Sequence, residues 1–147
     1  MPKRSTTKNL INYTSDLVEA VDRNLEVDAI YTDLSKAFDR VDHKLLVHKL
    51  KNFGISNCYF HGAIPDVPQG SNLGPLFFIL FINDVVGLFE NFHVYMFADD
   101  IKIAKVMTQE SDMSDLQANL DRLVEWCDEN GMLLNPGKCN FIKFSRK

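Results

Sequence analysis

Two adjacent aspartates, Asp99 and Asp100, are the residues of this 147-residue chain whose type and spacing best suit chemistry. Apolar and polar residues alternate on both sides of them, over residues 92–106, which predicts a β-hairpin with both carboxylates at its tip. Neighbouring side chains of a strand point to opposite faces, so two adjacent aspartates can face one target only from a turn. Like charges side by side repel each other unless a cation neutralises them. The plainer alternative is a solvated turn with no ligand.

A third carboxylate, Asp33, ends a mostly apolar and β-branched segment over residues 27–34, which predicts a strand. In an antiparallel sheet the end of this strand and the hairpin tip can lie side by side, which would bring three carboxylates together. Hard oxygen donors without a nearby His or Cys set suit Mg²⁺ or Mn²⁺ rather than zinc. A pair of such ions can activate an attacking oxygen and stabilise a leaving one, which is the two-metal route of nucleotidyl transfer.

The elements that would position these carboxylates follow the order α, β, α, α, β, β, α, β. Ser35 is expected to cap the second helix, and Gly54 and Gly131 are expected to end the second and fourth. The third helix is apolar nearly all round, so we expect it to be central and covered on most sides. The fold class predicted is α+β, an antiparallel sheet with helices packed on one face. Helices are expected over residues 9–24, 36–53, 69–89 and 111–130, and strands over 27–34, 92–106 (the hairpin) and 139–144.

Composition narrows the class of protein. A hydrophobic content of 46% and a charged content of 24% are those of one globular domain with a real core. The net charge of −4 counts against tight nucleic-acid binding by the chain alone. Three cysteines without C-x-x-C spacing favour a reduced intracellular setting, the nucleus or cytoplasm. Residues 1–9 do not form a signal peptide, and residues 73–89 fall short of the roughly 20 apolar residues of a membrane span, so no membrane association is expected.

Five segments, in order along the chain, resemble motifs of reverse transcriptases. Asp42-His43 continues the second of them as in the polymerases of non-LTR (LINE-type) retrotransposons. The resemblance spans nearly the whole chain and implies a polymerase palm domain. The segments are residues 4–7 (Arg-Ser-Thr-Thr), 31–39 (Tyr-Thr-Asp-Leu-Ser-Lys-Ala-Phe-Asp), 68–76 (Pro-Gln-Gly-Ser-Asn-Leu-Gly-Pro-Leu), 97–100 (Phe-Ala-Asp-Asp) and 133–139 (Leu-Leu-Asn-Pro-Gly-Lys-Cys).

The resemblance implies catalytic roles for the three acids. Asp33 and Asp99 match the family's metal ligands, and Asp100 matches a third acid, together serving two Mg²⁺ (or Mn²⁺) ions. The implied partners are an RNA template, a DNA primer and a deoxynucleoside triphosphate.

Four further residues match positions that contact nucleotide or template in the family. Phe38 falls where an aromatic side chain blocks the ribose 2′-hydroxyl, and the alternative is an ordinary core phenylalanine. Gln69 and Gly70 would touch the incoming nucleotide and the template strand. Lys138 would lie near the triphosphate or protonate the pyrophosphate leaving group, and the alternative is a solvated turn lysine.

The chain departs from the family pattern in its middle. Only residues 56–67 stand where the family carries a further helix and a strand pair, and Asp66 replaces the usual glycine before Val-Pro-Gln-Gly. An acid there has the wrong sign for a template contact. We therefore expect residues 1–147 to form a single partial reverse transcriptase domain, a palm with fingers and thumb largely absent, with weak or no activity alone.

The alternative is a catalytically silent palm that acts as a binding module, with self-association through apolar surface of residues 73–89. A receiver-like phosphate- or metal-binding domain is a third class, but the chain lacks the parallel β/α repetition that such a domain needs.

Overall fold

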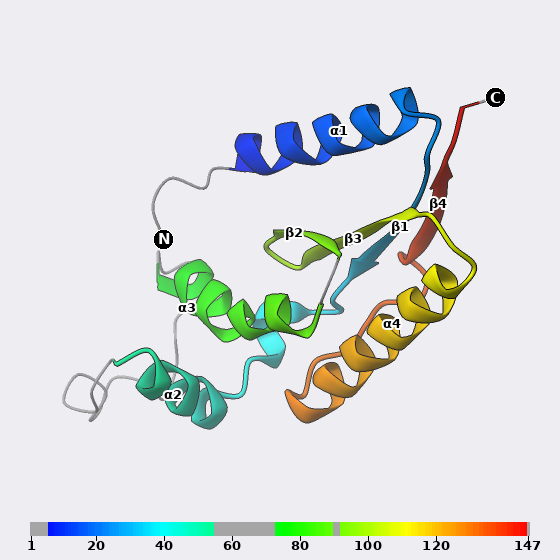
Figure 1. The fold of residues 1–147 in the computed structure, drawn as a ribbon. Coiled ribbons are helices and arrows are strands. Elements are labelled where there is room, and N and C mark those ends of the chain that lie inside the picture. Colours follow the sequence, from blue (N-terminus) through cyan, green and yellow to red (C-terminus); the bar gives the residue numbers. More distant parts are fainter. Residues whose placement is uncertain (1–5, 55–72, 90–91, 147) are drawn as a thin grey trace.

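The fold is α+β, as predicted, and consists of one antiparallel sheet with helices (Figure 1). The computed structural model describes residues 6–54, 73–89 and 92–146. Two of the short elements are 3₁₀ helices, η1 and η3. In chain order the elements are α1 (Thr6–Asp22), β1 (Glu26–Asp33), η1 (Ala37–Arg40), α2 (His43–Asn52), α3 (Leu73–Phe81), η3 (Asn83–Leu88), β2 (His93–Phe97), β3 (Asp100–Met107), α4 (Ser111–Glu129) and β4 (Asn140–Phe144).

The sheet has four strands in the order β2-β3-β1-β4, with β1 inside it. β1 pairs antiparallel with β3 along its whole length, from Glu26 opposite Met107 to Asp33 opposite Asp100. On its other side β1 pairs with β4. The strand expected to carry the first catalytic acid is therefore held from both sides, and this acid stands at its end, beside the hairpin.

Helices lie on both faces of the sheet, so the prediction that they pack on one face is wrong in this detail. α3 and α4 pack on the face that carries Ile30 of β1 and Ile101 and Ile103 of β3, and α2 packs against α3 in the same core. α1 lies against the opposite face, where Tyr13 packs with Ala29 (Figure 1). Coverage on both sides explains why β1 is mostly apolar instead of alternating, since both sets of its side chains are removed from water.

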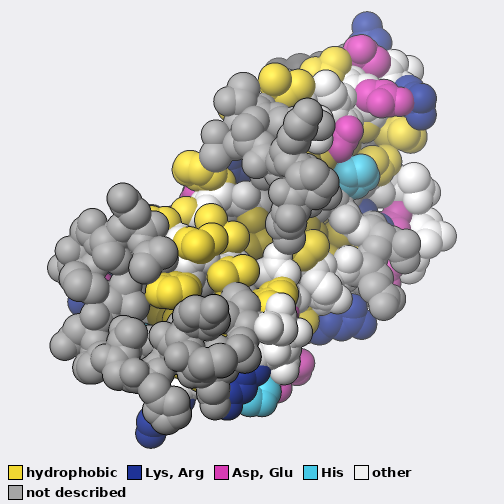
Figure 2. Space-filling view, turned by 90° about the vertical axis from the view of Figure 1, so that its left-hand side faces the viewer, with side chains coloured by type: hydrophobic (Ala, Val, Ile, Leu, Met, Phe, Trp, Pro, Cys, Tyr) yellow, Lys and Arg dark blue, Asp and Glu magenta, His cyan; other side chains and the backbone are white. Residues whose placement is uncertain are grey.

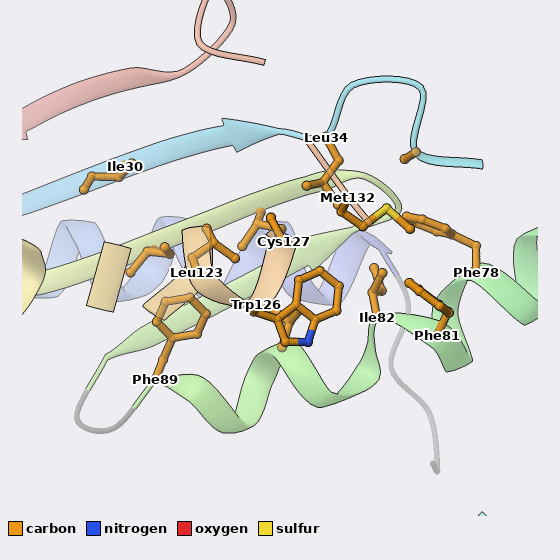
Figure 3. Close-up of a cluster of buried hydrophobic side chains, with 14 of the residues drawn as sticks. Ile30, Leu34, Phe78, Phe81, Ile82, Phe89, Leu123, Trp126, Cys127 and Met132 are labelled. Carbon is orange, nitrogen blue, oxygen red and sulfur yellow. The ribbon is translucent and has the colours of Figure 1, made fainter. Parts of the chain in front are cut away.

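The larger core lies between the sheet and the helices α2–α4 (Figure 3). Leu123, Trp126 and Cys127 of α4 meet Phe81 and Ile82 at the end of α3. The rings of Phe81 and Trp126 lie 6.4 Å apart at 71°, an edge-to-face arrangement that aromatic pairs prefer. This core holds the helices in place behind the sheet.

A nearly buried lysine, Lys49 of α2, is part of this helical layer. Its ammonium donates a hydrogen bond to the Phe81 carbonyl at 2.9 Å and pairs with Asp84 at 2.8 Å. The same nitrogen lies 4.4 Å from the centre of the Phe81 ring and 4.9 Å from that of Trp126. Burial lowers the pKa of Lys49, and the Asp84 carboxylate opposes that effect. This one side chain of α2 thus contacts residues of α3, η3 and α4.

The prediction of one helix over residues 36–53 is wrong in its first part, because these residues form two separate elements, η1 and α2. Lys36 before η1 has φ +51 without a side-chain cap, and Val41 after it is extended. The N-cap of α2 is Asp42, not Ser35: its carboxylate accepts hydrogen bonds from the backbone N–H groups of residues 44 and 45. An aspartate that binds the free N–H groups of the first turn is a strong start signal, so the α-helix begins there.

The helix predicted over residues 69–89 is also divided, into α3 and η3, and residues 69–72 lie outside the described part. α3 ends at Phe81, and Asn83 and Asp84 follow one residue later at the start of η3, where such side chains favour local bonds over a continuing α-helix. The expectation of coverage on most sides is wrong, since Leu76, Ile79 and Val86 are about half exposed. Figure 2 shows hydrophobic side chains grouped near the middle of one face of the molecule. No helix in the described ranges is long and apolar enough to cross a membrane.

The last helix and strand agree with their predicted bounds. α4 ends before Gly131, which has φ +67, the left-handed conformation of a helix stop. Asn119 and Trp126 of α4 are buried, whereas its apolar residues Met113 and Val124 are about half exposed.

Candidate active site

The hairpin turn between β2 and β3 consists of Ala98 and Asp99. Ala98 has φ +51, a left-handed conformation that allows the chain to reverse within two residues. Asp100 is already the first residue of β3, opposite Phe97 and Asp33, and it is exposed. The prediction that both aspartates lie at the tip is therefore correct for Asp99 only, because Asp100 is already paired with its neighbours in the sheet.

Asp33 and Asp99 lie on one hollow of about 390 Å³, which we call the carboxylate hollow. The Asp99 carbonyl accepts a hydrogen bond from the Leu34 N–H at 3.3 Å, which ties the turn to the end of β1. The sequence-predicted residues Phe38 and Lys138 line the same hollow. The structure thus brings together four candidates from three separate segments.

The segment that follows α4 forms the third wall of the carboxylate hollow. Ser35 N–H donates to the Leu133 carbonyl at 2.7 Å, and Asn135 N–H donates to the Asp33 carbonyl at 2.8 Å. The Asn135 amide nitrogen also lies 3.5 Å from the Asp33 carboxylate. Asn135 belongs to a segment that resembles a family motif but was not among the predicted site residues; its position three residues before Lys138 was the available signal.

Lys138 forms an ion pair with Asp33, with 3.1 Å between Nζ and Oδ2. The lysine side chain is 64% exposed, whereas the aspartate side chain is 14% exposed. The ammonium therefore covers the outer side of a mostly buried carboxylate.

Phe38 stands at the edge of the carboxylate hollow and also packs on the core. Its ring lies 4.6 Å from that of Phe78, with an angle of 37° between them, and the side chain is half exposed. The position suits contact with a ligand in the hollow as well as support of α3. The other two predicted contact residues, Gln69 and Gly70, lie outside the described residues.

The donor atoms of the carboxylate hollow suit a hard cation. Asp33 and Asp99 are acidic residues of its lining, carboxylate oxygens are ligands of such ions, and the Lys138 ammonium shows that a positive charge is accommodated beside Asp33. Within residues 6–54, 73–89 and 92–146 no group of three or more His, Cys, Asp or Glu side chains is arranged to hold a metal ion. Asp100 as a third ligand stays a prediction.

The antiparallel sheet, the acids beside its hairpin and the order of the motifs agree with the predicted resemblance to reverse transcriptases. The family model described as reverse transcriptase (RNA-dependent DNA polymerase) matches residues 2–146, so the chain belongs to that family. The predicted resemblance to reverse transcriptases of non-LTR retrotransposons is confirmed.

The curated relatives are polymerases of mobile elements. The chain is 30% identical over 169 residues to a probable RNA-directed DNA polymerase from transposon X-element of Drosophila melanogaster, over 97% of this chain and 19% of the relative. It is 27% identical over 173 residues to the RNA-directed DNA polymerase from mobile element jockey of Drosophila funebris, and this match covers 97% of this chain and 19% of the relative. A probable RNA-directed DNA polymerase from transposon BS of Drosophila melanogaster is 28% identical, over 91% of this chain and 18% of the relative.

These matches are longer than the chain itself. A match over 169 residues exceeds the 147 residues present, so the relative carries residues with no counterpart here. The chain spans about a fifth of the length of the curated relatives that it matches.

Proposed function

We propose that this chain is the palm part of an RNA-directed DNA polymerase that adds deoxynucleotides to the 3′ end of a DNA primer on an RNA template. The observation that carries the proposal is the meeting of Asp33 and Asp99 on one hollow, from the end of β1 and the β2–β3 turn. Carboxylates that reach one spot from two elements suit phosphoryl transfer, in which catalysis rests on positioning and electrostatics.

In this proposal Asp33 and Asp99 hold two Mg²⁺ (or Mn²⁺) ions, with Asp100 as a further acid. Bound ions of this kind stabilise charge on the attacking and leaving oxygens of a nucleotidyl transfer. The backbone contacts of β1 with β3 and with Asn135 fix the Asp33 main chain, so its carboxylate needs little reorganisation.

The remaining roles concern the nucleotide and the template. Phe38 at the rim of the carboxylate hollow excludes a ribose 2′-hydroxyl, and Lys138 faces the triphosphate. Gln69 and Gly70 contact the incoming nucleotide and the template strand.

Residues 1–147 are proposed to be a partial domain, with fingers and thumb supplied by other parts of a larger polymerase. Two facts support this: the chain matches about a fifth of its relatives' length, and these relatives carry extra residues within the matched region. Because template and primer would be held weakly, activity of the chain alone is expected to be weak or absent.

Primer extension on an RNA template with Mg²⁺ or Mn²⁺ tests the proposal. Incorporation of deoxynucleotides is expected to disappear in Asp99→Asn and to persist in Asp121→Asn, a matched change at an exposed position of α4. No incorporation by the folded wild-type chain at any concentration would reject autonomous activity.

The second candidate is a catalytically silent palm that binds other proteins or itself. It is favoured by the half-exposed Leu76, Ile79 and Val86 on α3 and η3, since a grouped apolar surface favours association. Light scattering should then show oligomers that Ile79→Ser dissociates, whereas a monodisperse wild-type monomer would contradict this. An intracellular setting, nucleus or cytoplasm, belongs to both candidates, and the free thiols of Cys127 and Cys139 are consistent with it.

A further inference from the structure

The ion pair between Lys138 and Asp33 joins an exposed ammonium to a carboxylate at the wall of the carboxylate hollow. Both the Lys138 Nζ, at 3.1 Å, and the Asn135 amide nitrogen, at 3.5 Å, approach the same oxygen, Asp33 Oδ2. An oxygen that already has a cation at contact distance cannot take a divalent ion at the same place. The ammonium and a metal ion therefore compete for one position.

The backbone of the turn that carries Lys138 is fixed independently of this ion pair. Leu134 forms a bridge with Leu34, and Asn135 N–H donates to the Asp33 carbonyl at 2.8 Å. Within the turn, the Asn135 carbonyl accepts from the Lys138 N–H at 2.9 Å. The lysine side chain can consequently leave Asp33 while its main chain stays in place.

We propose that Lys138 is the resident counter-cation of Asp33, and that a divalent cation entering the carboxylate hollow displaces it. The inference rests on the proposed function, because it assigns the divalent cation to Asp33. It adds that cation binding frees an ammonium at the rim of the hollow, where an anionic substrate group would meet it. Loading of the cation and presentation of Lys138 are thus one event.

The balance of interactions favours this exchange. The Lys138 side chain is 64% exposed, so its ammonium regains water on leaving, and exposed ion pairs contribute little. A carboxylate in a polar hollow binds a small divalent ion more strongly than a single lysine charge on a flexible four-carbon chain. The ion pair is strong enough to hold the carboxylate in the absence of the cation and weak enough to yield to it.

The test measures Mg²⁺ affinity by calorimetry for the wild-type chain, Lys138→Gln and Lys36→Gln. Lys36 lines the same hollow, so its replacement removes the same charge from the same surroundings. If the ammonium competes for Asp33, Lys138→Gln binds Mg²⁺ about two- to five-fold more tightly than Lys36→Gln, the range that corresponds to an exposed ion pair. The ¹⁵N resonance of the Lys138 ammonium should shift on addition of Mg²⁺ toward its position in Asp33→Asn.

The outcomes separate the inference from the proposed function. Equal affinities of the two lysine variants, or weaker binding by Lys138→Gln, would overturn the exchange while Mg²⁺ binding that depends on Asp33 still stands. Absence of Mg²⁺ binding by all three proteins would overturn the proposed cation site, and the exchange with it. Tighter binding by Lys138→Gln together with the ammonium shift supports the proposal.

Discussion

At Lys49 the contribution of a buried alkyl chain to the stability of the fold can be separated from the contribution of the charge at its end. The side chain is 11% exposed, and its nitrogen contacts Asp84, the Phe81 carbonyl and two aromatic rings. Replacement by alanine removes the stem and the charge, whereas replacement by methionine removes the charge and keeps a stem of similar length. Comparison of the two variants shows which part stabilises the packing of α2.

The two contributions differ in size. Lys49→Ala removes three methylene groups at about 0.8 kcal/mol each, so we expect a loss of about 2–3 kcal/mol in the free energy of unfolding. The ion pair with the half-exposed Asp84 contributes about 0.2–1 kcal/mol, and the desolvation that lowers the Lys49 pKa opposes it. We therefore expect Lys49→Met to change stability by less than about 1 kcal/mol.

Urea unfolding followed by the fluorescence of the single tryptophan, Trp126, and by circular dichroism measures these values. Lys51→Ala, at an exposed position of the same helix, is the matched control and should change stability by less than about 0.5 kcal/mol. Because the Lys49 pKa is below 10.5, the unfolded chain binds more protons just below that pH, so wild-type stability relative to Lys49→Met should rise there with pH. A loss in Lys49→Met as large as that in Lys49→Ala would refute the reasoning.

Two further predictions concern the start and the end of α4. The Asp112 carboxylate accepts hydrogen bonds from Thr108 N–H and Gln109 N–H and pairs with Lys105, which together hold its pKa well below the usual range. The stability that this carboxylate adds relative to Asp112→Asn should be complete above pH 3.8 and decline as the pH falls below that value. A difference in urea midpoint between wild type and Asp112→Asn that is the same at pH 7 and pH 2 would contradict this. Gly131→Ala should lower the free energy of unfolding, measured by thermal unfolding, by about 1–2 kcal/mol, because φ is +67 at this position. No atom lies within 4 Å of the added Cβ, so a steric clash would not be the cause. Gly87→Ala, with equally open space and no positive φ, should be neutral or stabilising, and equal losses in both would show that φ is not the cause.

The parts of the fold that the sequence predicted are those with a strong local pattern. β1 follows from a run of mostly apolar and β-branched residues, the hairpin from alternation and α4 from helical spacing. The two broken helices were not predicted, because the pattern of apolar residues continues through Val41 and Val85 while the backbone does not. A strong cap at Asp42 decided the first break.

The candidate site was predictable where it depends on one strand end and one turn. Asp33 and Asp99 meet because β1 and β3 are adjacent and antiparallel, which the motif order and the hairpin already indicated. The ion pair of Lys138 and the contacts of Asn135 arise from the docking of a distant turn on β1. No local pattern encodes such docking, since it depends on the packing of α4 behind the sheet.

The measurement that tests the account most directly is Mn²⁺ binding, followed by electron paramagnetic resonance. It compares the wild-type chain with Asp33→Asn, Asp99→Asn, the double variant and the control Asp121→Asn. If the two carboxylates form one cation site, each single variant loses about ten-fold or more in affinity, the double variant loses less than the combined effect, and the control is unchanged. Wild-type affinity in both single variants, or losses that combine as for independent sites, would contradict the account.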